Sequence, residues 1–131
     1  MYCIDTNIVI DIFRGDLKLK NRLEFIQRLG IEVSITFLSV AELYKGVYLS
    51  ARKDESLLLV EDFLKNVISL NLSMKSCDLF GMDYGELKKK GKIVPEVDLL
   101  IASIAKAEGR IFVTRNEKHF KDIPDLKVEV W

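Results

Sequence analysis

The chain has few of the residues on which several protein classes depend. Its 131 residues include only two prolines, two cysteines (Cys3 and Cys77) and one histidine, His119. With 49% hydrophobic residues and so little proline, the composition excludes a disordered chain. Two cysteines and one histidine cannot supply the four ligands of a structural zinc site. We therefore expect both cysteines to be buried, reduced thiols in a cytoplasmic protein.

Long apolar runs and a net charge are also absent. The longest apolar runs, 57–60 and 99–102, are far short of the roughly 18 residues that a membrane span needs. Asp5 and Asp11 stand where a signal peptide would have its apolar segment, so we expect no secretory leader. Twenty basic residues balance twenty acidic ones, which excludes a polycation that coats nucleic acid. Any contact with nucleic acid must therefore use a local patch or a bound metal.

Short apolar runs alternate with amphipathic segments along the whole chain. Strands are expected at 2–4, 31–35, 67–70, 111–113 and 127–130, and helices at 6–13, 17–29, 36–50, 55–65, 73–90 and 97–108, with a turn or short helix at 116–122. Thr6 or Asn7 is expected to cap the first helix, and Asp54 the one at 55–65. The alternation predicts an α/β fold with a mostly parallel central sheet of about four to five strands and helices on both faces. The length fits one domain, 1–131.

Polar residues close two of the expected strands. Asp5 follows the first strand, and Thr114, Arg115 and Asn116 follow the fourth. In an open parallel sheet, ligands bind at the carboxyl ends of the strands, near the point where the strand order reverses. If the two strands are neighbours, their polar groups open into one crevice.

Two further acids lie in apolar helices, beside small residues on the same helical face. Glu42 is surrounded by the apolar segment 36–49, and Asp98 opens the segment 98–105. Each has an ordinary alternative when taken alone. Glu42 can be an exposed residue paired with Lys45, and Asp98 can be an acid favoured at a helix start by the helix dipole. Glu96 can take either role of Asp98.

Three carboxylates gathered in one cleft would repel one another, and a divalent cation removes that repulsion. Mg²⁺ prefers oxygen ligands and is held by a few carboxylates together with substrate phosphate. Mn²⁺ accepts the same ligands. Asp5, Glu42 and Asp98 therefore suit metal-assisted hydrolysis of a phosphodiester, although the sequence alone does not place them together.

Four segments together resemble the PIN domain, and in particular the VapC-type toxin ribonucleases. The segments are Asp5-Thr6-Asn7, Ser39-Val-Ala-Glu42-Leu, Asp98-Leu-Leu-Ile-Ala-Ser-Ile-Ala and Thr114-Arg-Asn116-x-x-His-Phe120. Each is weak alone, but all four occur in order, at this spacing, in a chain of this length. The resemblance extends over nearly the whole chain.

The resemblance implies a Mg²⁺- or Mn²⁺-dependent endoribonuclease that acts on RNA, the toxin of a type II toxin–antitoxin pair, bound by a cognate antitoxin protein. It implies that Asp5, Glu42 and Asp98 are the catalytic and metal-binding acids. Thr6 and Thr114 would not bind the metal themselves but would orient Asp5 or a water bound to the metal. The family often has a fourth acid where this chain has Asn116. Glu96 is the alternative candidate for the role of that fourth acid.

Other functions remain to be weighed against this one. A catalytically weak PIN scaffold would bind RNA or a protein without cleavage, but the three acids are intact. A haloacid-dehalogenase-like phosphatase needs a second aspartate two residues after the first, where this chain has Asn7. A phosphorylated receiver domain is disfavoured because Asp5 lies too close to the start for a preceding strand.

Two surface features carry further expectations. The helices at 37–50 and 55–65 have more apolar side chains than one inward stripe can hold, which predicts a homodimer interface. The lysine run at 88–92 is either a solvated helix end or a contact for an RNA phosphate backbone. The RNA target and the position of the cut are not predicted.

Overall fold

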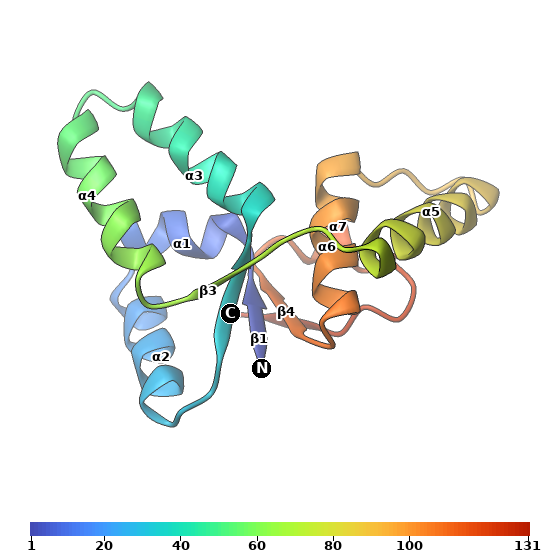
Figure 1. The fold of residues 1–131 in the computed structure, drawn as a ribbon, viewed down its shortest axis with the longest axis horizontal. Helices are drawn as coiled ribbons and strands as arrows, with labels where there is room; N and C mark the ends of the chain where they lie inside the picture. Colours follow the sequence, from blue (N-terminus) through green and yellow to red (C-terminus); the bar gives the residue numbers. More distant parts are fainter.

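The computed structural model describes all residues, 1–131, and has a five-stranded parallel sheet at its centre (Figure 1). The strands are β1 (Tyr2–Ile4), β2 (Val33–Thr36), β3 (Ile68–Leu70), β4 (Ile111–Thr114) and β5 (Val128–Val130). The helices are α1 (Thr6–Phe13), α2 (Leu17–Arg28), α3 (Phe37–Leu49), α4 (Lys53–Leu64), α5 (Met74–Lys89), α6 (Glu96–Ala107) and α7 (Glu117–Phe120). The predicted α/β class is confirmed.

The first strand occupies the middle of the sheet. The strand order is β3-β2-β1-β4-β5, and Cys3 of β1 lies opposite Ser34 of β2 and Phe112 of β4. The Asp5 amide donates to the carbonyl oxygen of Val113 over 2.8 Å, so the β1–β4 pairing continues one residue past β1. The strand that Asp5 follows and the strand that Thr114 ends are therefore neighbours, and the strand order reverses between them.

Helices cover both faces of the sheet, because successive side chains of a strand point to opposite faces. Ile4 belongs to the core formed with α1 to α4, and Cys3 belongs to the core formed with α5 to α7. Figure 1 shows these two groups of helices on opposite sides of the strands.

The residues that begin the helices differ in part from those expected. Asp5 is the N-cap of α1 and accepts the Thr6 amide, so neither Thr6 nor Asn7 is the cap. Asp54 lies in the first turn of α4, after an N-cap residue, Arg52, that makes no side-chain capping bond. An acid within the first turn is favoured by the helix dipole without being the cap.

The two cysteines differ in environment. Cys3 is fully buried in the sheet, and this burial raises the pKa of its thiol to about 12. Cys77 is exposed, because it lies on the solvent side of α5, so the expectation of burial is wrong there. Neither cysteine forms a disulfide, and none of the helices is both long and apolar enough to span a membrane.

Candidate active site

Asp5 lies at the centre of the carboxyl edge of the sheet, directly after β1. Its Oδ1 accepts the Thr6 amide over 2.8 Å, and its Oδ2 accepts the Thr114 hydroxyl over 2.7 Å. The residue is only 8% exposed. Burial raises the pKa of this carboxyl, and repulsion from Asp98 and Glu42 raises it further, while the bonds from Thr114 and Thr6 oppose the rise.

The other two predicted acids face Asp5 from helices on opposite faces of the sheet. Glu42 projects from α3, which begins directly after β2, and its Oε1 accepts the Thr6 hydroxyl over 3.1 Å. Asp98 is the third residue of α6, so it lies near the end of that helix where the dipole favours an acid. Both charges act on Asp5. The structure therefore brings the three acids to one edge of the sheet.

Thr114 links several groups at this edge and is fully buried. Its hydroxyl donates to Asp5 and accepts the Asn116 amide over 2.9 Å. Asn7 reaches the same oxygen with Nδ2, over 3.4 Å. The hydroxyl thus has one acceptor and two donors around it, which fixes its hydrogen toward Asp5.

The two candidates for a fourth site residue differ in position. Asn116 points its side-chain amide at His119, with Nδ2 2.9 Å from Nδ1 of the ring. The same Nδ1 lies 3.0 Å from Oδ2 of Asp98. The Glu96 side chain is exposed and takes no part in the hydrogen bonds and ion pairs that link the residues of this edge. Of the two, Asn116 is the one connected to the acids.

Asn7 and His119 contact the acids or their partners, although no separate feature of the sequence singled them out. Asn7 follows Asp5 by two residues and therefore turns back toward β4 from the first turn of α1. His119 follows Asn116 by three residues, which places both side chains on one face of a helical turn. That spacing was the available signal for His119.

The oxygen-rich edge fits a hard divalent cation. As the side chains lie, no group of three or more His, Cys, Asp or Glu residues surrounds a single point closely enough to hold an ion. However, the buried Oδ1 of Asn7 has no hydrogen-bond partner, which marks an acceptor without a donor beside Asp5 and Thr114. Carboxylate and amide oxygens are the ligands that Mg²⁺ and Mn²⁺ accept.

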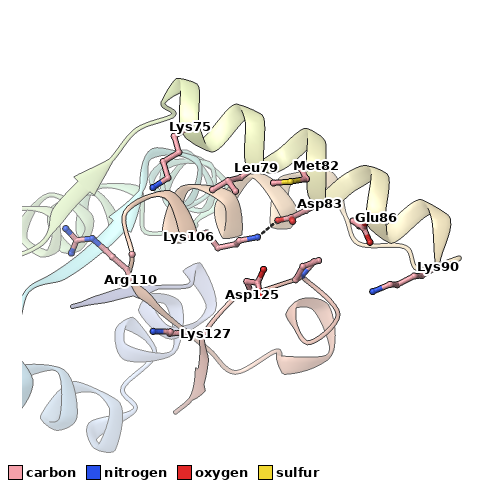
Figure 2. A pocket seen from close by; sticks show the side chains of 12 residues that line it. Lys75, Leu79, Met82, Asp83, Glu86, Lys90, Lys106, Arg110, Asp125 and Lys127 are labelled. Carbon is pink, nitrogen blue, oxygen red and sulfur yellow. Dashed lines mark hydrogen bonds and ion pairs between the residues drawn. The ribbon is translucent and has the colours of Figure 1, made fainter.

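The groove of about 580 Å³ along α5 lies elsewhere, at the amino ends of the strands (Figure 2). Two largely buried cations of this groove are paired with acids of the protein. Lys106 and Asp83 are 2.6 Å apart and largely buried, and Arg110 contacts Glu32. None of the predicted site acids lines this groove.

Comparisons with known proteins agree with this fold. The PIN domain family matches residues 2–126. The chain is 36% identical to "Ribonuclease VapC2" of Haemophilus influenzae, over 99% of this chain and 97% of the relative. It is also 36% identical to "Ribonuclease VapC2" of Rickettsia felis, over 100% and 98% of the two chains.

A solved structure extends the likeness to three dimensions. It is described as VapBC2 from Rickettsia felis bound to a DNA fragment from their promoter, and it matches with a TM-score of 0.92 at 35% identity. The match covers 99% of this chain and 98% of the other. The chain therefore belongs to the PIN-domain family, among the VapC ribonucleases.

Proposed function

We propose that the chain is an endoribonuclease that hydrolyses RNA phosphodiester bonds with Mg²⁺ or Mn²⁺, and that residues 1–131 act as one domain. One observation carries the proposal. Asp5 is a buried carboxylate repelled by Asp98 and Glu42, and no lysine or arginine pairs with any of the three. A divalent cation would compensate this excess of negative charge, as it does in sites that cleave phosphodiesters.

The residues of the edge divide into two roles under this proposal. Asp5, Glu42 and Asp98 would hold the cation, which supplies an acidified water and neutralises charge on the phosphate. Thr114 and Thr6 would orient the acids, because Thr114 donates to Asp5 and Thr6 donates to Glu42. These bonds restrain Asp5 and Glu42, although the three acids must still move closer together to surround one ion.

Metal removal tests the proposal. A fluorescent RNA should be cut by the purified chain in Mg²⁺, remain intact in excess EDTA, and be cut again when Mn²⁺ is added in excess. Full cleavage in EDTA would refute metal dependence. An RNA that binds but stays uncut with either ion would instead support a scaffold that binds without cleavage.

We also propose a cognate antitoxin as a protein partner, because the similar Rickettsia felis structure is described as a VapBC complex. A segment of that antitoxin would cross the acidic edge and offer a basic side chain to the carboxylates. Co-expression with the adjacent gene should abolish toxicity and yield a complex that co-purifies. If no neighbouring protein co-purifies with the tagged chain, this part fails and the nuclease proposal stands.

A homodimer is the remaining partner proposal. Large apolar side chains lie exposed on the hairpin of α3 and α4, at Phe37, Tyr48, Leu49, Leu58 and Leu59. An exposed apolar surface shared by two adjacent helices is typical of a protein interface. Light scattering at micromolar concentration should give about 30 kDa, twice the 15.0 kDa of one chain. A mass near 15 kDa would contradict the dimer.

A further inference from the structure

His119 makes two contacts that cannot both hold with the Asn116 amide as it is oriented. Nδ1 of the ring lies 3.0 Å from Oδ2 of Asp98, an acceptor, and 2.9 Å from Nδ2 of Asn116, a donor. One ring nitrogen carries either a hydrogen or a lone pair, so it cannot donate to the first and accept from the second.

Turning the Asn116 amide by half a turn resolves the conflict. The oxygen and nitrogen of an asparagine amide are nearly the same in shape and are assigned from their hydrogen bonds. With Oδ1 toward the ring, Nδ1–H of His119 donates to both Asp98 and Asn116. In a neutral ring this arrangement requires the tautomer that carries its hydrogen on Nδ1, and in a doubly protonated ring Nδ1 carries a hydrogen as well.

The segment from Thr114 to His119 then connects two acids that come from different parts of the chain. Asp98 is bonded to His119, and His119 to the Asn116 side chain. The Asn116 backbone amide donates to Thr114, and Thr114 donates to Asp5. Short links of 2.7 to 3.0 Å thus join the carboxylate at the end of β1 to the carboxylate of α6.

Local structure explains why these residue types occur at this spacing. Asn116 is the residue before α7, and the His119 amide donates to the Asn116 carbonyl oxygen over 3.1 Å. The first turn of the helix therefore brings the two side chains together, because residues three apart lie on one helical face. Thr114 ends β4 and is held in place by the sheet.

We propose that His119 is a positioning residue for Asp98 and that Asn116 orients its ring. The inference rests on the proposed metal-dependent activity and deepens it. Nδ1–H holds Oδ2 of Asp98, and the other carboxylate oxygen keeps no partner within the protein. The Asn116 oxygen then accepts a hydrogen bond from His119. The segment from Thr114 to His119 thus holds Asp5 and Asp98 in position for the proposed cation.

Variants of His119 separate its two ring nitrogens. An asparagine side chain places its nitrogen where Nδ1 lies, whereas glutamine places it nearer Nε2. Calorimetric titration of Mn²⁺ into the RNA-free protein should show a roughly 10-fold loss of affinity in His119→Ala, the lower end for residues that orient metal ligands. His119→Asn should recover affinity to within about threefold of the original, and His119→Gln should not. Lys118→Ala, on the same turn and without side-chain contacts, is the matched control.

A double-variant cycle tests whether His119 acts through Asp98. His119→Ala should cost no further Mn²⁺ affinity when introduced into Asp98→Asn, because the partner of Nδ1 has already changed. Equal losses in both backgrounds would overturn the proposal, as would equal affinity of His119→Ala and the unaltered chain. Rescue by glutamine instead of asparagine would overturn it too, since Nε2 would then be the acting atom.

Failure of the proposed function has a different outcome. If the unaltered chain binds no Mn²⁺ and cuts no RNA, both proposals fall. If it binds Mn²⁺ and cuts RNA while the His119 variants bind as it does, only the role of His119 falls. Thermal unfolding in EDTA should be similar for all His119 variants, because the side chain is 48% exposed.

Discussion

The two edges of the sheet differ in how their buried charged side chains are paired. At the amino edge, Lys106 lies 2.6 Å from Asp83 (Figure 2). Arg110 contacts Glu32 there, so opposite charges meet within the protein. At the carboxyl edge, Asp5 faces two further carboxylates and is held by hydroxyl and amide donors alone. The two largely buried cations of the amino edge each contact an acid, whereas the carboxyl edge gathers carboxylates without a lysine or arginine partner.

This difference separates a structural use of charge from a functional one. A buried ion pair stays neutral as a unit, and loss of either partner destabilises the fold. Like charges held together are costly in the free protein and favourable only with an added cation. The comparison therefore predicts that removing an acid has opposite consequences at the two edges.

The largest expected effect is on activity. Asp5→Asn should lower the rate of RNA cleavage about 10³-fold, the scale of losing a group that stabilises the transition state. The fold should persist, because the asparagine is nearly the same size. Cleavage of a fluorescent RNA at saturating Mg²⁺ measures the effect, with circular dichroism to check the fold.

Asp83→Asn is the matched acid-to-amide change at the other edge. It should leave the cleavage rate within about threefold of the original, since Asp83 lies in the groove and not among the three acids. If both variants lose activity alike, the two edges are not functionally distinct.

The second effect is on stability. Asp83→Ala should lower the free energy of unfolding by about 3 kcal/mol, because it leaves Lys106 buried without its partner. Asp78→Ala, an exposed acid on the same helix, should change it by less than about 0.5 kcal/mol. Urea unfolding of both variants in EDTA measures the difference, and equal losses would show that the ion pair is unimportant.

The third effect is the response to metal. Mn²⁺ at about 100 times its dissociation constant should stabilise the original chain by about 2.7 kcal/mol, because only the folded state binds it. Asp83→Ala is less stable than the original chain, but Mn²⁺ should raise its free energy of unfolding by the same amount. In Asp5→Asn, Mn²⁺ should raise the free energy of unfolding only slightly. If Mn²⁺ stabilises Asp5→Asn as much as it stabilises the original chain, the ion binds elsewhere.

The parallel sheet and its carboxyl edge could be predicted in outline from the sequence. Alternation of strands and helices indicates a parallel sheet, and Asp5 and Thr114 each follow an apolar run. Periodicity does not say which strands are neighbours, so the meeting of Asp5, Glu42 and Asp98 needed the resemblance and then the structure. The contacts among these acids depend on helices packed on opposite faces of the sheet.

Details that depend on one torsion or one neighbour were not predictable. The capping role of Asp5 was missed because Thr6 is an equally good cap by composition. The exposure of Cys77 depends on which side of α5 packs against α6. The sequence showed His119 only as one residue of the segment that resembles the family. Its contact with Asp98 could not be predicted, because Asp98 is distant in the chain.

The smallest expected effect is a reversal of stability with metal and pH at Asp5. Burial and repulsion raise the pKa of this carboxyl above its ordinary 3.8, so the folded state binds the proton more tightly than the unfolded state does. Stability is therefore lost as the pH rises from the unfolded value through the folded one, and remains lower at neutral pH. An asparagine side chain cannot ionise, so the Asp5→Asn variant should avoid this loss.

In EDTA at pH 7, the Asp5→Asn variant should melt at a higher temperature than the original chain, by up to about 5 °C, the scale of a change near 1 kcal/mol. The difference should shrink as the pH falls through the raised pKa of Asp5 toward its ordinary value of 3.8, because the folded chain then takes up the proton. Saturating Mn²⁺ should reverse the order at pH 7, because only the original chain gains the full stabilisation of the ion. Scanning calorimetry across pH and metal measures all three. If Asp5→Asn melts lower than the original chain in EDTA at pH 7, the hydroxyl and amide donors around Asp5 outweigh the burial and the repulsion, and the carboxyl edge has no cost of charge that a cation must offset.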